Sequence, residues 1–501
     1  MNLGRIAIFG ATGYIGMLLT NELIQSETEI RLFVRNKKRL LYIKKSDNIK
    51  AYDYELKEEN IVPIASALEG VNVLYYLIHS TTSSDENFAD KDYELAMIVS
   101  KASKLAKVGQ IIFLGALGAR SDSLSVHLSS RHSTADMLRH DGQNVTELRT
   151  AIIIGAGSLS FEIIRVLAKK LPFLPKLKIT GGLTQPIDVD DVLTFLIRAA
   201  NNSRYYNSIV ELGGEQISYN NLITLYSRTI PKVDMPIVEI GFLEKILTAK
   251  IVSHIVVFLS SAPYSIIRPL IDGASADALS YDWHYRKIDP NAPRLNDIPH
   301  MMRKAYAKEK RGEVESFWGI PSENQVLSSA SEEAILKDSD IKKEIYRQKI
   351  DVDNFENIFN EILNIGGKHG YWSPSWMWKI RGFVDKLQGG PGLHGGRRTY
   401  RKEIRVGERI DFWIVSKVVN TDIMKQLRLK ARMYSPGDSW LEFTLLNDND
   451  EKSFTITAYF KPRGTHGKLY WYSLYFIHKY IFRAMLLKII SNSKEKFCSI
   501  N

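Results

Sequence analysis

Three glycines near the start of the chain have the spacing of a turn that binds phosphate groups. Gly10, Gly13 and Gly16 follow the short apolar run Arg5 to Phe9 and precede an amphipathic segment that ends near Leu23. In such a strand–turn–helix unit, the glycines permit a tight bend, a close approach of the backbone to a pyrophosphate, and close packing of the helix on the sheet. Free amides at the helix N-terminus bind the phosphates. The predicted dinucleotide contacts are Gly10, Thr12, Gly13, Tyr14, Ile15 and Gly16.

The segment after the second predicted strand distinguishes between the two common dinucleotides. An acidic residue there binds the ribose hydroxyls of NAD, whereas an arginine accepts the 2′-phosphate of NADP. No acid lies between Ile30 and Leu41, and the segment contains Arg35 and Lys38 among other cations. The sequence therefore predicts NADP as the cofactor in preference to NAD, with Arg35 and Lys38 near the phosphate.

Two further residues are expected at the edge of the sheet where ligands of open α/β folds bind. Asp53 follows the next short strand and is placed to accept a hydrogen bond from the adenine amino group. His79 ends the apolar run "LYYLIHS" and is expected near the nicotinamide. The alternative for His79 is a structural role at the end of its strand.

Alternating β-branched and helical segments up to about Gly214 predict an α/β fold, a doubly wound parallel Rossmann sheet. A helical extension is expected from about Tyr219, so that the first domain covers residues 1–311. The candidate strands are Arg5 to Phe9, Glu29 to Val34, Val73 to Ile78, Gln110 to Leu114, Asn144 to Leu148 and Ile209 to Leu212.

A second domain is predicted at residues 367–495, after a charged segment at 312–366 that we interpret as a linker. Six of the eight tryptophans follow Gly367. Period-two segments within residues 409–460 indicate an antiparallel sheet, and an aromatic helix, Leu469 to Ile490, ends the domain. These features predict a C-terminal α+β domain.

Motifs in both halves resemble known families. "IFGATGYIG", "FVRN", "LEGVNVLYYLIHS", "IIFLGALG" and "TQPIDVDDVLTFL" resemble the atypical, or extended, short-chain dehydrogenase/reductase superfamily, of the NmrA-like or nucleoside-diphosphate-sugar epimerase-like kind. "WLEF" and "FKPRGTHGKLYWYSLYFIHKYIFRAM" resemble an uncharacterised START-like helix-grip domain that is often fused to such reductases. The first resemblance implies an NAD(P)-binding oxidoreductase. The second implies an apolar cavity between a sheet and a long helix.

The usual catalytic triad of that superfamily is absent here. The resemblance implies a serine and a Tyr-x-x-x-Lys pair, but His127 takes the tyrosine position, Arg131 takes the lysine position, and Gly115 and Ala116 end the serine strand. A histidine can donate a proton near neutral pH, and an arginine can bind a ribose hydroxyl or a phosphate. His127, Arg131 and the second possible acid, His132, are the predicted catalytic residues. The alternative is that all three are ordinary polar residues at a helix start.

In the second domain, the resemblance implies that aromatic side chains line the apolar cavity, although a role in an aromatic core is the main alternative. These side chains are Trp413, Trp440, Phe443, Tyr459, Trp471 and Phe476. A small apolar or lipid-like molecule is the expected ligand. The basic residues Arg397, Arg398 and Arg401 are predicted either to bind an anionic head group or to form a solvated loop.

Composition limits the other classes of function. A single cysteine, Cys498, excludes a disulfide framework, and the histidines have no metal-ligand spacing. We predict a cytoplasmic protein with no resident metal, since no secretory signal is found. The net charge of +11 accompanies no nucleic-acid motif. Two apolar segments are interrupted by polar residues, so neither is expected to span a membrane: Ile251 to Leu270 and Leu469 to Ile490. The second segment can contact a membrane surface.

Three functions are consistent with these features. The first is an NADP-binding oxidoreductase that acts on a hydrophobic carbonyl or quinone-like substrate. The second is a non-catalytic NADP sensor or scaffold, which the missing triad favours. The third is a lipid-binding or membrane-surface protein in which the nucleotide is structural.

Overall fold

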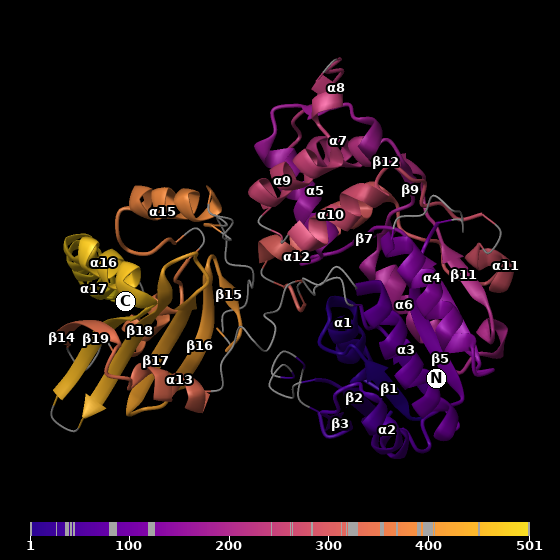
Figure 1. The fold of residues 1–501 in the computed structure, drawn as a ribbon, viewed down its shortest axis with the longest axis horizontal. Helices are drawn as coiled ribbons and strands as arrows, with labels where there is room; N and C mark the ends of the chain where they lie inside the picture. Colours follow the sequence, from indigo (N-terminus) through magenta and orange to yellow (C-terminus); the bar gives the residue numbers. More distant parts are fainter. Residues whose placement is uncertain are drawn as a thin grey trace. The chain divides into compact units, whose positions relative to one another are not determined.

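The computed structural model describes most of the chain, as two compact units, Met1–Gly319 and Ile320–Asn501. The described residues are 3–26, 28–35, 40, 43, 46–79, 88–118, 126–241, 243–260, 262, 264–281, 284–311, 313–316, 318, 329–350, 355–366, 369–387, 392, 393, 404, 406–448 and 451–498. Figure 1 shows both units, which are described separately below.

The first unit is built on a parallel sheet of seven strands in the order β11-β6-β5-β4-β1-β2-β3. The strands are β1 (Ile6–Phe9), β2 (Ile30–Phe33), β3 (Ile49–Tyr52), β4 (Val73–Tyr76), β5 (Gln110–Ala116), β6 (Val145–Thr150) and β11 (Ile209–Leu212). All six candidate strands are therefore confirmed. The order reverses between β1 and β4, so the carboxyl ends of these two strands border the crevice where open α/β folds bind ligands.

Helices cover both faces of this sheet (Figure 1). The helices α2 (Ile61–Ala67), α3 (Phe88–Leu105) and α4 (Val126–Arg139) pack together on one face, and α1 (Tyr14–Leu23) and α6 (Val189–Ala199) contact each other on the other. The strands of the centre are almost continuously apolar, because both of their faces are buried. This is the doubly wound arrangement that the sequence predicts.

Residues 219–311 form a helical extension, part of which packs against α5 (Leu159–Lys170). Its helices are α7 (Tyr219–Thr229), α8 (Leu243–Ile246), α9 (Ala249–Ser260), α10 (Tyr264–Gly273), α11 (Tyr285–Ile288) and α12 (Ile298–Arg311). Short strand pairs also occur outside the main sheet. They join β7 (Ile153–Ile154) with β10 (Ile187–Asp188), β8 (Leu174–Pro175) with β13 (Ile237–Val238), and β9 (Leu183–Thr184) with β12 (Ile217–Ser218). The apolar stretch 251–270 is thus divided between α9 and α10. In the described part of the chain, no helix has both the length and the apolar character that a membrane span requires.

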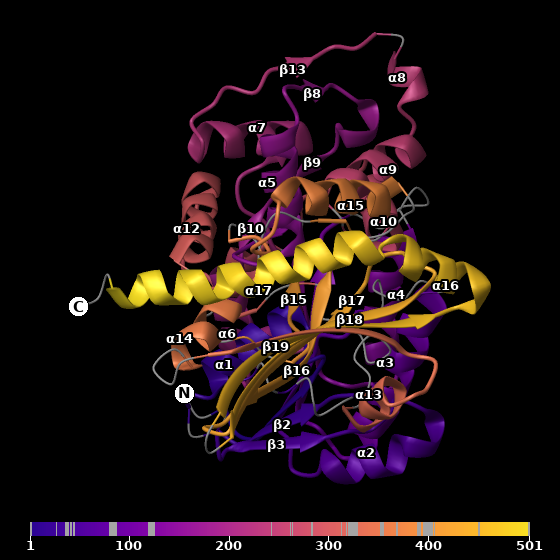
Figure 2. The same cartoon turned by 90° about the vertical axis from the view of Figure 1, so that its left-hand side faces the viewer.

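The second unit is a six-stranded antiparallel sheet crossed by a long helix (Figure 2). Its strands follow the order β14-β19-β18-β17-β16-β15. They are β14 (Lys342–Lys349), β15 (Arg409–Ile410), β16 (Trp413–Asn420), β17 (Met424–Ala431), β18 (Gly437–Asp448) and β19 (Glu451–Pro462). The helices of this unit are α13 (Ser329–Leu336), α14 (Phe355–Ile362), α15 (Ser375–Leu387), α16 (Gly464–Ser473) and α17 (Tyr475–Cys498). One face of the sheet packs on α14 and α17 in a large apolar core.

The interpretation of residues 312–366 as a linker is wrong for the part that the structure describes. Strand β14 pairs with β19 over its whole length, from Lys342 opposite Phe460 to Lys349 opposite Ser453. Helix α14 buries Phe355, Ile358 and their apolar neighbours in the core. The charged side chains that suggested a linker belong to an edge strand, where solvated charges protect the sheet from pairing with other chains.

Candidate functional site

The turn between β1 and α1 has the geometry that the glycine spacing predicts. Gly10 has φ +87°, a conformation that favours glycine, and a Cβ there would lie 2.7 Å from the backbone of Leu77. A Cβ on Gly16 would lie 2.2 Å from the carbonyl oxygen of Gly10. The first and third glycines are therefore required by the close packing of β1, α1 and the segment after β4.

Gly13 and the start of α1 form the part of this turn that faces solvent. Gly13 is the exposed N-cap of α1, and no side chain caps the helix. The first amides of a helix have no acceptor within the helix, so those of Tyr14 and Ile15 are available to a phosphate. Thr12 lies between the glycines and is half-buried. These residues can hold a pyrophosphate through the backbone alone.

The side chain of Tyr14 has a different role from the one expected. Its hydroxyl donates a hydrogen bond to the carbonyl oxygen of Ala156, at 3.0 Å. Burial, reinforced by the charges of Asp190 and Glu309, raises the pKa of Tyr14 far above its ordinary value. The phenol therefore joins α1 to the segment after β7, and only the backbone of Tyr14 is positioned for a ligand.

Three other predicted contacts follow neighbouring strands at the same carboxyl edge. Arg35 comes after β2 and Asp53 after β3, and both side chains are exposed. His79 comes after β4, with 34% of its side chain exposed. Because the strands are parallel, these residues and Gly10 lie along one edge. Lys38 lies outside the described residues.

Behind this edge is an acid that the sequence analysis missed. Asp92 of α3 is completely buried, with its Oδ2 3.4 Å from Nδ1 of His79 and 3.4 Å from the hydroxyl of Ser130. Burial, with a smaller effect from the charge of Arg131, lowers the pKa of His79, and the contact with Asp92 opposes this shift. The sequence signal that could have identified this acid is its spacing. Asp92 lies four residues before Ala96, and the two share the buried face of α3.

Arg131 is held by the backbone rather than directed at a substrate. Its guanidinium donates to the carbonyl oxygens of Ile78, at 3.2 Å, and Leu114, and lies 4.5 Å above the ring centre of Phe113. Burial lowers the pKa of Arg131, and the charge of Asp92 opposes this shift. Arg131 therefore ties the ends of β4 and β5 together, which makes it a positioning residue.

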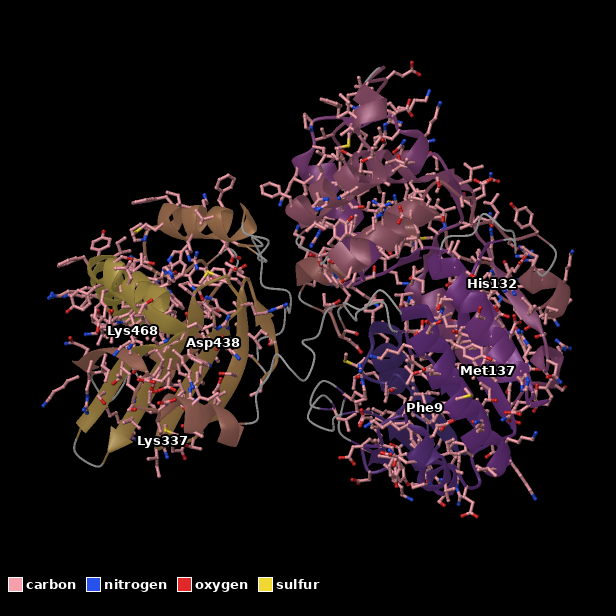
Figure 3. All side chains as sticks on the ribbon, in the orientation of Figure 1. Phe9, His132, Met137, Lys337, Asp438 and Lys468 are labelled. Carbon is pink, nitrogen blue, oxygen red and sulfur yellow. The ribbon has the colours of Figure 1, made fainter. Side chains whose placement is uncertain are left out.

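The two predicted histidines of α4 are in different situations. His132, which belongs to α4 and is labelled in Figure 3, is only 5% exposed, so it is not an accessible acid. The backbone of His127 forms part of the first turn of α4, but its side chain lies outside the described residues. Among the described residues, no group of three or more histidine, cysteine or acidic side chains can hold a metal ion.

The aromatic residues expected around a cavity in the second unit are mostly placed elsewhere. Trp413, Phe443 and Trp471 belong to the apolar core, which α17 fills with Ile481, Phe482, Met485, Leu486 and Ile489. Trp440 and Tyr459 pack in a smaller cluster with α13, and Phe476 is exposed. Arg397, Arg398 and Arg401 lie outside the described residues. The space between the sheet and the helix is therefore packed, not hollow.

An open groove of about 900 Å³ lies instead beside α17. Tyr371, Trp378 and Leu393 line it opposite Ala484 and Leu487, with other residues of the segment before α15. Tyr371 stacks on Trp378, at 4.5 Å between ring centres, and its hydroxyl donates to Asp411 at 2.8 Å. The groove thus combines a flat aromatic wall with one buried carboxylate.

Comparison with known proteins identifies a matching family for part of each unit. Residues 10–165 match the NAD(P)H-binding family, and residues 343–485 match a family of proteins of unknown function, DUF2867. The chain therefore contains an NAD(P)-binding Rossmann-type domain followed by a DUF2867 domain. No curated protein matches the chain.

The solved structures that are similar to this chain include the following three. WbmG of Bordetella bronchiseptica in complex with NAD is 14% identical, with a TM-score of 0.46, over 63% of this chain and 97% of that one. A nucleoside-diphosphate-sugar epimerase of Staphylococcus aureus is 14% identical, with a TM-score of 0.46, over 60% and 99%. UDP-glucuronic acid 4-epimerase of Bacillus cereus, in complex with UDP-glucuronic acid and NAD, is 14% identical, with a TM-score of 0.44, over 61% and 99%.

Proposed function

We propose that the protein is an NADP-dependent oxidoreductase that reduces a carbonyl or quinone-like group on a hydrophobic substrate. The observation that carries this proposal is the glycine turn after β1, which lies beside the end of β4 where the strand order reverses. When bound, the reduced cofactor supplies a hydride. Arg35, at the carboxyl end of β2, is the residue we assign to the 2′-phosphate of NADP.

In this proposal, the residues around the crevice position the reacting groups and supply the proton. Arg131 holds the ends of β4 and β5 in place, and Asp92 fixes the orientation of His79. His127, in the first turn of α4, is the proposed proton donor to the substrate oxygen. The hydride and this proton together convert a carbonyl to an alcohol.

Arg35→Ala is expected to weaken NADPH binding at least tenfold and to leave NADH binding unchanged, because a hydrogen bond to a charged group contributes about 1.5–3 kcal/mol. Cofactor fluorescence titration of the full chain measures both affinities. The control is Arg5→Ala, which removes an exposed arginine before β1, at the opposite edge of the same sheet. Equal losses for the two cofactors, or an equal loss in the control, would contradict the assignment of NADP to Arg35.

The same preparation tests whether the cofactor reacts. NADPH absorbance is followed with a panel of quinones and apolar aldehydes, with His127→Ala as the comparison. Oxidation that this variant abolishes supports the oxidoreductase. Tight NADPH binding with no oxidation by any panel member would replace it with the second candidate, a non-catalytic NADP sensor or scaffold, which the absence of the usual triad supports.

For the second unit, we propose that the groove beside α17 binds a small apolar molecule. The support is its aromatic wall and its volume of about 900 Å³, within the 300–1,000 Å³ of ordinary ligand sites. Ala484→Phe places a ring in the groove and is expected to weaken binding of a long-chain fatty acid at least tenfold, as measured by tryptophan emission. Ala334→Phe, on the exposed side of α13, is the matched control and should not change it.

A further inference from the structure

The helices α16 and α17 carry a row of large apolar side chains that nothing in the described chain covers. Each of these side chains is at least half exposed, from 53% for Leu487 to 81% for Phe476. Within each helix they are three, four or seven residues apart, which places the members of one helix on one side of it. The row consists of Leu469, Tyr472, Phe476, Tyr480 and Leu487.

The opposite side of α17 is already used for folding. Ile481, Phe482, Met485, Leu486 and Ile489 are buried in the core against the sheet. A surface helix of a soluble protein normally has one apolar face and one polar face. Since α17 has apolar residues on both sides, its outer face requires a second apolar environment.

Positive charge lies within and beside this outer face, since Arg483 is three residues after Tyr480 and four before Leu487. Lys468, Lys479, Arg483 and Lys488 are exposed on the same two helices, and Lys468 is labelled in Figure 3. The sequence contains no acidic residue between Gly464 and Lys494. Exposed aromatic and aliphatic side chains that are accompanied by cations and by no acid fit a helix that lies in the surface of an anionic membrane.

Helix α15 extends the apolar surface. Its residues Trp376, Ile380 and Phe383 are all more than half exposed and share one helical side. Figure 1 and Figure 2 both show α15 beside α16 and α17, and Arg381 lies 5.9 Å above the ring centre of Tyr470. The groove described above is lined by α15 and α17 together. The exposed apolar residues of these three neighbouring helices are here called the α15–α17 face.

We propose that the α15–α17 face docks on the surface of an anionic lipid bilayer, with the helices lying in the interfacial layer and not crossing it. The charge on the face selects this occupant over a second copy of the chain, because two such faces would bring like charges together. The inference is independent of the oxidoreductase proposal, because it concerns only the second unit. It identifies the surface on which the third function predicted from the sequence, that of a lipid-binding or membrane-surface protein, would depend.

The test uses the full chain and sedimentation with vesicles of phosphatidylcholine, with and without phosphatidylglycerol. We expect binding to the anionic vesicles, at least tenfold weaker binding to the neutral ones, and a decrease as salt is raised. Phe476→Ser and the double variant Lys479→Glu/Arg483→Glu should each reduce binding at least tenfold. Both change exposed side chains, so the thermal midpoint should be unaffected.

Ile423→Ser is the matched control, because Ile423 is 71% exposed in the β16–β17 turn and belongs to none of these helices. It should bind vesicles like the unmodified chain. The proposal is overturned if the unmodified chain binds neither kind of vesicle, or if Phe476→Ser binds as well as the control. It is also overturned, in favour of a second copy, if light scattering detects a dimer that Phe476→Ser dissociates while vesicle binding is absent.

Discussion

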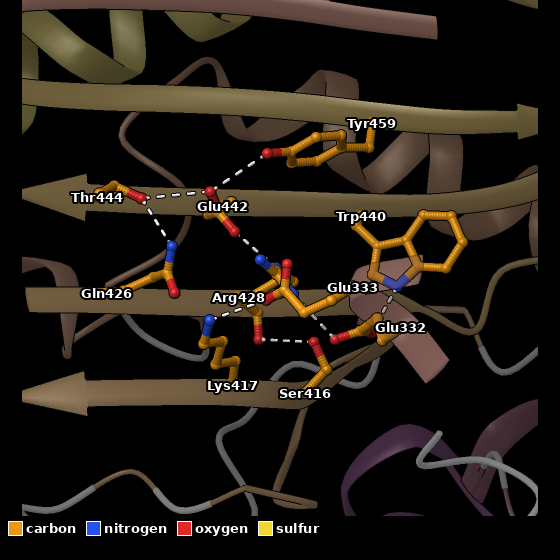
Figure 4. A network of polar contacts seen from close by, with 10 residues as sticks. All are labelled: Glu332, Glu333, Ser416, Lys417, Gln426, Arg428, Trp440, Glu442, Thr444 and Tyr459. Carbon is orange, nitrogen blue, oxygen red and sulfur yellow. Dashed lines mark hydrogen bonds and ion pairs between the residues drawn. The ribbon is translucent and has the colours of Figure 1, made fainter. Parts of the chain in front are cut away.

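Replacing Arg428 with methionine is expected to lower the free energy of unfolding of the second unit by about 3–5 kcal/mol, the cost of breaking a buried ion pair by removing one partner. Arg428 is buried in the sheet at the centre of the polar network in Figure 4. Its Nε donates to Glu442 at 2.6 Å, and its Nη1 lies 3.3 Å from Glu332 and 3.1 Å from Glu333. Without it, two carboxylates would be buried with no adjacent cation.

The network also attaches α13 to the sheet, which adds to the expected loss. Glu332 accepts a hydrogen bond from Trp440 Nε1 at 2.7 Å, and Glu333 pairs with Lys417 at 2.8 Å. Both glutamates belong to α13. Loss of Arg428 therefore weakens the contact between β17 and a segment that lies almost a hundred residues earlier in the sequence.

Urea denaturation followed by tryptophan emission measures the loss, since six of the eight tryptophans lie in the second unit. The control is Arg463→Met, which removes an exposed arginine paired with Asp438 at 3.0 Å and should cost less than about 1 kcal/mol. The expectation is wrong if the two variants lose equal stability.

Acid should reduce the difference between the Arg428 variant and the unmodified chain. A hydrogen bond from Lys417, assisted by Arg428, lowers the pKa of Glu333, so this group stabilises the native fold above its ordinary pKa of 4.5 and the effect is lost as the pH falls. Part of this shift comes from the charge of Arg428, so the variant has less of this stabilisation to lose in acid. The free energies of unfolding of the two proteins should therefore differ most at neutral pH and converge as the pH is lowered well below 4.5. A difference that grows with acid would contradict the network.

Gly13→Ala is expected to weaken dinucleotide binding at least tenfold while the fold remains intact. Gly13 has φ −78°, which any residue adopts, and its Cβ would lie 3.2 Å from the carbonyl oxygen of Gly10. The fold can accept this contact with a small shift. The added methyl group, however, occupies space that a pyrophosphate needs in order to reach the first amides of α1. Titration with NADPH and NADH measures the loss, which applies to both cofactors.

Gly181→Ala is a closely matched control. Gly181 is exposed with φ −86°, and its Cβ would also lie 3.2 Å from a carbonyl oxygen three residues earlier, that of Lys178. Both glycines donate their amides to those same oxygens, at 2.9 Å and 3.0 Å. The two substitutions should thus change the thermal midpoint equally, and only Gly13→Ala should affect the nucleotide. If both variants bind like the unmodified chain, the glycine turn is not the nucleotide site.

The sequence by itself determined the parts of the protein that depend on local patterns. The glycine spacing after β1 predicted a turn whose geometry is confirmed. Gly10 has a positive φ and Gly16 packs closely on the backbone of Gly10, so both positions require glycine. The strands of the first sheet were recognised because strands buried on both faces are continuously apolar. The NAD(P)-binding domain follows from these same signals.

Only the tertiary structure decided the roles of residues whose partners are distant in the sequence. Strand β14 is charged, and its place in the sheet depends on β19, about a hundred residues later. The sequence predicts Arg131 as a catalytic residue, with an ordinary polar role as the alternative, and only the folded chain places the carbonyl oxygens of Ile78 and Leu114 around it. Likewise, the aromatic residues of α17 divide between the core and the α15–α17 face according to what the sheet covers. Burial and ion pairing between remote segments are properties of the packed chain, and periodicity along the sequence does not encode them.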